Sequence, residues 1–369
     1  MSPTDFPGSW LNIGTAYDLN GANQGTLPSG YVSIQGENQN LRWESTDELN
    51  MGVDFGLLGG RITGSFDYFV RETKDILIQP PIAGAIGEGR VRWLNGATKT
   101  NKGWEALLTY HHSTQGGLNY SFTGSAAHFR DKITVLPPEV RTAYQGTSTN
   151  SVIGHSQLDI FGYKFDGIFQ NQGEVDAHVT QTGKGIGRIR YKDLNGDGRI
   201  NATDRDWIGT QLPKMEYGIR VDLDYKNIDL SIFGSGVAGK RGFDPMGDLN
   251  KFVFVNSNNG RDLLNAWTPE NPTKIPMASL VNRNDEFRQS DFRQVNASYF
   301  KLRNVQLGYT LASTGLQRFK MAGLRIYLIG QNLVALKDKE YTAKDPERVG
   351  GLGNWSQPTT YTLGLNITF

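Results

Sequence analysis

Apolar and polar residues alternate strictly over short stretches that recur along most of the chain. The clearest stretch is 361–369, where Tyr, Leu, Leu, Ile and Phe hold the odd positions and Thr, Gly, Asn and Thr the even ones. A strand points successive side chains to opposite faces, so each such stretch predicts a strand with one apolar and one polar face. We expect about nine strands, at 49–57, 61–68, 104–110, 118–123, 217–225, 228–232, 304–311, 324–328 and 361–369.

The connections between these stretches indicate the fold class. The polar face of 217–225 carries Arg220, Asp222 and Asp224, so it must be in contact with water. Either a β-sandwich or a membrane barrel allows this. Short turns at 59–60, 116–117 and 226–227 alternate with long links at 71–103, 127–213, 235–298 and 334–360. Such long links are uncommon in compact domains, whereas short turns on one side and long loops on the other are typical of outer-membrane barrels. The sequence therefore predicts an all-β fold, an antiparallel transmembrane β-barrel.

The same connections predict an orientation. Counting back from Phe369 puts the end of the last strand on the short-turn, periplasmic side. Residues 1–40 and the link 127–213 then fall on the extracellular side. The odd strand count, and the lack of a signal-peptide pattern at the N-terminus, favour a C-terminal piece of a longer secreted protein whose partner strands lie upstream.

Composition excludes several classes of protein. Charges nearly cancel, with 38 basic and 37 acidic residues, so nothing indicates nucleic-acid binding. The chain has no cysteine, which excludes disulfides, zinc–thiolate sites and a cysteine nucleophile. The five histidines have no metal-ligand spacing, and no G-x-S-x-G motif occurs, so we expect no enzyme activity. No apolar run approaches the roughly 20 residues of a membrane helix.

One motif carries chemistry. Asp193, Asn195 and Asp197, followed by Gly198, place oxygen side chains at positions 1, 3 and 5 of a calcium-type loop with glycine at position 6. The Arg199 carbonyl and the Asp204 carboxylate, at positions 7 and 12, complete the predicted ligand set. Calcium would have a structural role in the long link. An Asx-rich turn without a metal is the alternative, because Asp, Asn and Gly favour turns in any case.

Several stretches, in order, resemble a known family. Taken together, they identify the chain as similar to the C-terminal half of SusC-like TonB-dependent outer-membrane transporters, from about residue 37 onward. The matching stretches are 40–46 (NLRWEST), 162–170 (GYKFDGIFQ), 191–198 (YKDLNGDG), 208–209 (IG), 297–309 (ASYFKLRNVQLGY), 331–333 (QNL) and 361–369 (YTLGLNITF).

The resemblance implies a barrel of about 22 strands with a plugged lumen, of which this chain would be the last part. It also implies an outer-membrane location, a SusD-like surface lipoprotein as an extracellular lid, and TonB acting through a Ton box. The plug and the Ton box are absent from this chain. Family cargoes are oligosaccharides or oligopeptides.

We therefore expect a nutrient importer that catalyses no reaction. Polar side chains of the strands, among them Asp54, Asp67, Glu105, Arg220 and Asp222, would line the inner wall. No residue is assigned to substrate on sequence grounds. Two alternatives stay open. A calcium-stabilised extracellular β-sandwich that binds or adheres would fold in water without detergent. An outer-membrane barrel enzyme would need a catalytic arrangement that the sequence does not display.

Overall fold

The computed structural model describes residues 38–80, 92–147, 150–244, 246–254, 256–280, 286–311, 320–343, 345–347 and 356–369. The predicted extracellular segment 1–40 therefore lies almost wholly outside the described residues. Within them, no helix is long and apolar enough to cross a membrane.

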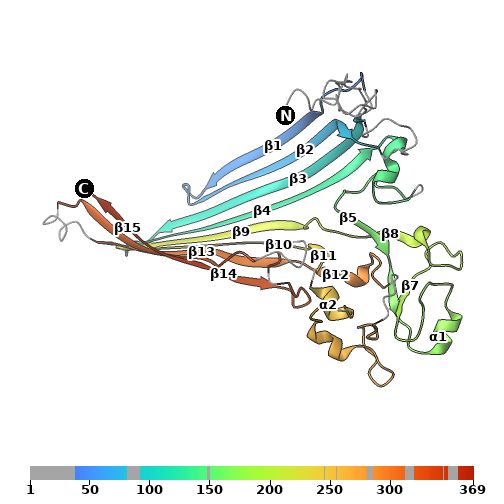
Figure 1. The fold of residues 1–369 in the computed structure, drawn as a ribbon. Coiled ribbons are helices and arrows are strands. Elements are labelled where there is room, and N and C mark those ends of the chain that lie inside the picture. The colour runs from blue at the N-terminus through green and yellow to red at the C-terminus, as the bar shows by residue number, and fades with distance from the viewer. Residues whose placement is uncertain are drawn as a thin grey trace, which may run out of the picture. The chain divides into compact units, whose positions relative to one another are not determined.

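Nine strands form one sheet, as the alternation predicts. Their order is β1-β2-β3-β4-β9-β10-β13-β14-β15, and the pairs from β4 to β15 are antiparallel (Figure 1). The predicted all-β, antiparallel fold class is confirmed. The strands are β1 (Ser45–Leu57), β2 (Ile62–Ile78), β3 (Leu94–Ser113), β4 (Leu118–Val135), β9 (Met215–Tyr225), β10 (Ile228–Ala238), β13 (Tyr299–Leu311), β14 (Gly323–Lys337) and β15 (Thr360–Thr368).

Several strands are longer than predicted, so the predicted limits of the long links are wrong. The links run from 79 to 93, 136 to 214, 239 to 298 and 338 to 359. The reason lies in stretches such as 71–78, where Arg71, Thr73, Lys74 and Asp75 place polar side chains on both faces. A strand that is polar on both faces has no period-2 signal, although its backbone still pairs.

The long links carry structure of their own. Three two-stranded sheets form, from β5 (Asp159–Tyr163) with β8 (Arg205–Thr210), β6 (Phe165–Ile168) with β7 (Ile189–Tyr191), and β11 (Arg241–Phe243) with β12 (Gln294–Asn296). The helices are α1 (Gln172–Ala177) and α2 (Gly247–Lys251), with 3-10 turns at Pro138–Ala143, Ala202–Asp204, Arg261–Asn265 and Asp291–Arg293.

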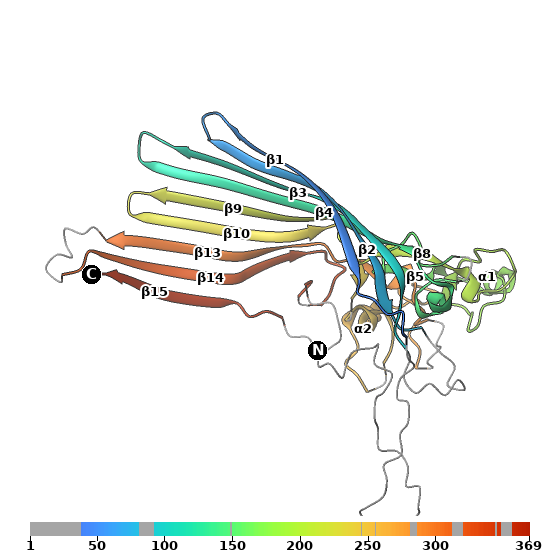
Figure 2. The same ribbon diagram turned by 90° about the horizontal axis from the view of Figure 1, so that it is seen from above.

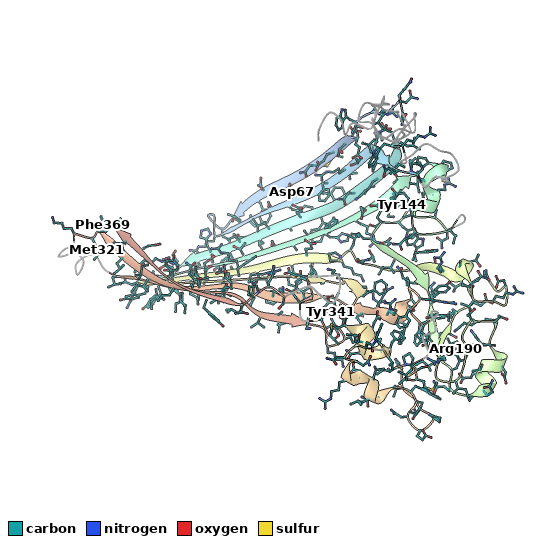
Figure 3. All side chains as sticks on the ribbon, viewed as in Figure 1. Asp67, Tyr144, Arg190, Met321, Tyr341 and Phe369 are labelled. Atoms are coloured by element: carbon teal, nitrogen blue, oxygen red, sulfur yellow. The ribbon has the colours of Figure 1, made fainter. Side chains whose placement is uncertain are left out.

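Short and long connections lie at opposite ends of the strands. Backbone bonds join the short-turn end across the sheet: the His111 N–H donates to Arg61, that of Thr310 to Asn227 and that of Ala322 to Thr368, at 2.7–2.8 Å. Figure 2 shows the β9–β10 turn at the end opposite α1 and α2. Met321 and Phe369 lie at this short-turn end and Tyr341 at the other (Figure 3).

The chain divides into two compact units, and the first four strands run through both. The first unit comprises 1–49, 69–102 and 130–157. Its core includes the buried residues Ile133, Leu136, Val140 and Val152. The buried Asp131 accepts a hydrogen bond from Ser156 Oγ (2.6 Å) and forms an ion pair with Lys99 (3.2 Å).

The second unit, 50–68, 103–129 and 158–369, contains a part of all nine strands and has two contrasting faces. One face, here the apolar face, is left uncovered by the described residues: Leu363 is 72% exposed and Met51 62%. A β-sandwich would bury such a face under a second sheet. An apolar face that no protein covers is instead the lipid-facing pattern of a barrel, so the sandwich alternative is wrong. The apolar face also carries Val53, Leu108, Ile219, Ile228, Leu328 and Leu365.

Candidate functional site

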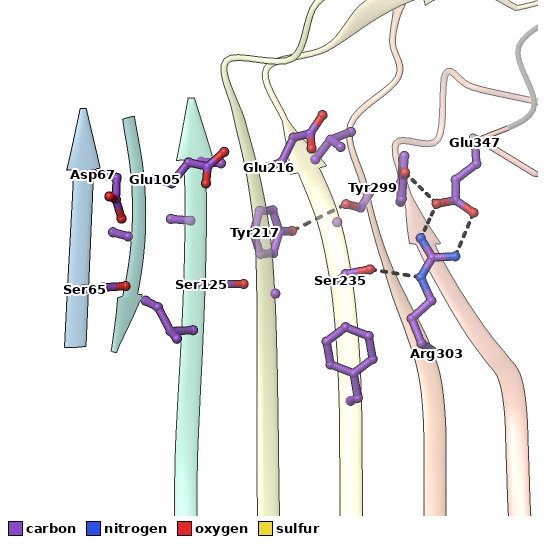
Figure 4. A pocket seen from close by; sticks show the side chains of 18 residues that line it. Ser65, Asp67, Glu105, Ser125, Glu216, Tyr217, Ser235, Tyr299, Arg303 and Glu347 are labelled. Atoms are coloured by element: carbon purple, nitrogen blue, oxygen red, sulfur yellow. Dashed lines mark hydrogen bonds and ion pairs between the residues drawn. The ribbon is translucent and has the colours of Figure 1, made fainter. Parts of the chain in front are cut away.

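The opposite face of the sheet in the second unit is polar and holds a cavity of about 570 Å³. We call it the pocket face. Four carboxylates from separate elements border this cavity, namely Asp67 on β2, Glu105 on β3, Glu216 on β9 and Glu347 from the link after β14 (Figure 4). The hydroxyl groups of Ser65, Ser125, Ser235, Tyr217 and Tyr299, together with Arg303, complete the polar lining.

Three of the carboxylates take part in no ion pair. Within the described part of the chain, the Asp67, Glu105 and Glu216 side chains form no hydrogen bond or ion pair, and Glu216 is attracted to Lys240 at longer range. Glu347, in contrast, accepts from Arg303. Excess negative charge in a recess raises the local concentration of cations and lowers that of anions. This side of the cavity therefore favours neutral polar groups and positively charged groups over anions.

Nearer the short-turn end, two arginine–carboxylate pairs lie on the pocket face. Arg220 Nε donates to both oxygens of Asp222, at 2.8 and 3.0 Å, and Ser121 Oγ donates to the same carboxylate. Arg325 on β14 pairs with Asp229 on β10. A second cavity of about 390 Å³ lies beside these side chains.

The sequence-predicted wall residues thus separate into groups. Asp67 and Glu105 line the first cavity, and Arg220 and Asp222 line the second. Asp54 is exposed on β1 and lines neither. Sequence reasoning missed Glu216, Arg303 and Glu347. Glu216 lies two residues before Gly218 and four before Arg220 on the same strand face, so the alternation could have identified it.

Arg303 reaches the pocket face because β13 bulges there. The pairing with β10 skips one residue, since Phe233 lies opposite Asn304 and Gly234 opposite Leu302. A bulge adds one residue to a strand and re-aims its side chain. Arg303 consequently donates to Ser235 Oγ (3.0 Å) on β10 and to Glu347.

The predicted calcium loop is compact. The Asp193 carboxylate accepts from the Gly196 and Gly198 N–H groups, at 2.8 and 3.0 Å. Asp204, fully buried, accepts from the Leu194 and Asn201 N–H groups and so joins the two ends of the loop. Carboxylate oxygens of Asp193, Asp197 and Asp204 lie within 4.8 Å of one another.

The other two predicted ligands lie in the same loop. Asn195 Oδ1 accepts from the Asp197 N–H (2.9 Å), and the Arg199 N–H donates to Asp197 Oδ1 (2.8 Å). This Arg199 N–H, followed by the Asn201 amide, lowers the pKa of Asp197, so that carboxyl stays ionised. An all-oxygen donor set with three negative charges fits a hard cation such as calcium. These two backbone bonds, from the Asp197 N–H to Asn195 and from the Arg199 N–H to Asp197, are those of Asx turns, which also form without a metal. The Asn195 and Asn201 amides donate to the Asp197 carboxylate as well.

Comparison with known proteins identifies relatives over almost the whole chain. A TonB-dependent receptor, P26, of Formosa agariphila is 28% identical over 377 residues, covering 95% of this chain and 37% of the relative. The TonB-dependent receptor SusC of Bacteroides thetaiotaomicron is 25% identical over 344 residues, covering 90% and 32%. The chain thus spans about a third of the length of these curated relatives. No protein-family model matches.

A solved structure shares the fold. The structure of the RagAB peptide transporter superposes with a TM-score of 0.75 over 95% of this chain and 38% of that one, at 21% identity. At this identity the likeness establishes the fold alone. Both the shared fold and the uncovered apolar face indicate that the nine strands form part of a barrel wall.

Proposed function

We propose that this chain, a SusC-like part of a TonB-dependent receptor, belongs to an importer of oligosaccharides or oligopeptides. Its place is the outer membrane. Receptors of this type are not enzymes, so cargo passes without bond chemistry. Because the chain spans only about a third of its relatives, the activity is that of the whole protein.

One observation carries the proposal: a single sheet has an apolar face that no described residue covers and a polar face with a cavity of about 570 Å³. A wall of this kind separates lipid from a polar passage. The charged and hydroxyl-bearing side chains around the cavity suit a cargo rich in hydrogen-bonding groups, as sugars and peptides are.

The partners follow from the same proposal. A SusD-like lipoprotein would close the long-link end, where the small sheets and helices of the links extend beyond the strands. TonB would act from the short-turn end, through parts of the protein outside this chain. Lipid would contact the apolar face.

The proposal is tested by growth. A strain that lacks the full-length gene is supplied with a protein digest, or with a partial hydrolysate of a polysaccharide, as its sole source of nutrient. Complementation with the gene restores growth on one of these, provided the neighbouring lipoprotein and TonB are present. The proposal is wrong if the complete protein with its lid neither binds nor imports any oligomer.

The cavity predicts a charge preference. Because Asp67, Glu105 and Glu216 take part in no close ion pair, a lysine-rich peptide should bind the full-length protein several-fold more tightly than a glutamate-rich peptide of equal length. Replacing the three by Asn, Gln and Gln should remove the preference. Asp222→Asn, on the same face but paired with Arg220, is the matched control and should retain it. Equal binding of both peptides by the unmodified protein would contradict this prediction.

We further propose that the loop 193–204 binds calcium, with Asp193, Asn195, Asp197, the Arg199 carbonyl and Asp204 as ligands. The support is the convergence of three carboxylates around a tightly turned backbone. Calcium should then raise the hydrogen-exchange protection of this loop in the full-length protein, and a chelator should lower it by about tenfold or more. Asp193→Asn should abolish the response, whereas Asp176→Asn, an exposed residue in α1, should not. Identical protection with and without calcium would favour the metal-free turn.

A further inference from the structure

The link after β14 returns to the pocket face. We call residues 338–343 and 345–347 of this link the strap. Tyr341 is buried against Val295 and Ala297 of the preceding link, together with the strap's own Ala343. Pro346 is also fully buried. An extracellular link with so much buried surface differs from a solvated loop, because its side chains have lost their freedom in exchange for packing.

Hydrogen bonds to one buried carboxylate hold the first half of the strap. Asp244, in the link before α2, accepts from the Thr342 N–H, from Thr342 Oγ1 (2.6 Å) and from the Ala343 N–H (3.2 Å). Backbone donors that end on a carboxylate are charge-assisted and are stronger than neutral pairs. The strap is therefore joined to a second link as well as to the sheet.

Ion pairs hold the second half of the strap to β13. Lys301, only 5% exposed, donates to Asp345 (2.6 Å) and to Glu347 (2.9 Å). Arg303 pairs with both oxygens of Glu347, and Tyr299 Oη donates to the same carboxylate at 2.9 Å (Figure 4). Two acids of the strap thus meet two cations of one strand. Removing either partner of such a buried network leaves an uncompensated charge.

The β13 bulge makes this network possible. Lys301 lies opposite Ser235 in the regular register, and the extra residue at 303 brings a second cation to the same face. Ser235 fixes the Arg303 guanidinium from the side away from Glu347. Arg303 is accordingly a positioning residue. It affects the cavity by holding Glu347 of the strap in place.

We infer that the strap is a permanent part of the inner wall, so that any opening for cargo is left to the other long links. This inference rests on the proposed importer function. Glu347 borders the 570 Å³ cavity, so the position of the strap sets the width of that cavity on one side. The competing possibility is a moving lid that releases Arg303 and Lys301 during each cycle.

Hydrogen exchange on the detergent-solubilised full-length protein tests whether the network holds the strap. Unmodified protein should protect the amides of residues 338–343, 345 and 347. Glu347→Gln should raise their exchange by at least about tenfold, while Glu347→Asp retains most of the protection. Asp229→Asn is the matched control, since it breaks another arginine–carboxylate pair on the same face and leaves the strap untouched. Retained protection in β14 and β15 verifies that each variant is folded.

A disulfide distinguishes a fixed strap from a moving one. Val295→Cys with Ala343→Cys introduces a pair within one buried cluster of a chain that has no cysteine of its own, and any cysteine in the rest of the full-length protein is first replaced by serine. Mass spectrometry verifies the bond before uptake of the protein digest or polysaccharide hydrolysate is measured. A fixed strap leaves uptake in the oxidised protein within about twofold of its reduced form.

Each outcome decides the inference. Uptake that is lost on oxidation and restored by a reductant overturns it. A strap that exchanges as fast as an unstructured peptide in the unmodified protein also overturns it. If the unmodified protein imports nothing, the proposed function fails, and the exchange measurement alone still decides whether the strap is fixed.

Discussion

At the scale of single residues, the ion pairs of the strap could not be predicted from the sequence. Lys301 and Arg303 lie outside the strand predicted at 304–311, and the bulge in β13 brings both to the pocket face. Their acidic partners, Asp345 and Glu347, follow more than 40 residues later in a link without periodicity. A contact between a strand and a distant link depends on the path of the chain, which alternation does not encode. The calcium loop could be predicted because all its candidate ligands lie within one short motif.

The residue scale also predicts a pH dependence of the strap. The Arg303 guanidinium, followed by Lys301 and Tyr299, lowers the pKa of Glu347 to about 2, from an ordinary value of 4.5. A depressed pKa stabilises the folded form above the unfolded pKa, and this stabilisation is lost as the pH falls toward the folded pKa. Protection of the strap amides should therefore be constant between about pH 8 and 5 and fall between about 4.5 and 2. A fall between pH 8 and 6 would contradict the assignment.

At the scale of elements, Gly308 leaves space above β13 for an ion pair between the strands on either side of it. Asp229 on β10 lies opposite Gly308 on β13, and Arg325 of β14 reaches over it. A Cβ at position 308 would lie 2.3 Å from Asp229 Oδ1 and 2.6 Å from Arg325 Nη2. Gly308→Val should therefore destabilise the sheet by about 1–3 kcal/mol.

The measurement is the urea midpoint of the detergent-solubilised full-length protein. Gly124→Val is the matched control, because a Cβ there meets no atom within 4 Å. Equal midpoints for the two variants would show that the Asp229–Arg325 pair does not need the space above Gly308.

Elements also mark the limit of prediction from sequence. All nine large strands could be located, because each has a stretch with one apolar face. The ends of β2 and β3 and the small sheets of the links could not, because both of their faces meet polar surroundings or other links. Backbone pairing at those places depends on neighbours that only the folded chain provides.

At the scale of the whole molecule, we propose that one sheet separates lipid from a polar passage, with its long links outside the cell. The uncovered apolar face, the charged pocket face and the opposite placement of turns and links all agree with this claim. The most direct test is the labelling of single cysteines in intact cells with a membrane-impermeant maleimide. Gln172→Cys, exposed in α1, reports on a long link, and Gln115→Cys, exposed in the β3–β4 turn, reports on the opposite end. We predict labelling at position 172 in intact cells and at position 115 only after lysis; labelling at 115 in intact cells with protection at 172 would contradict the account.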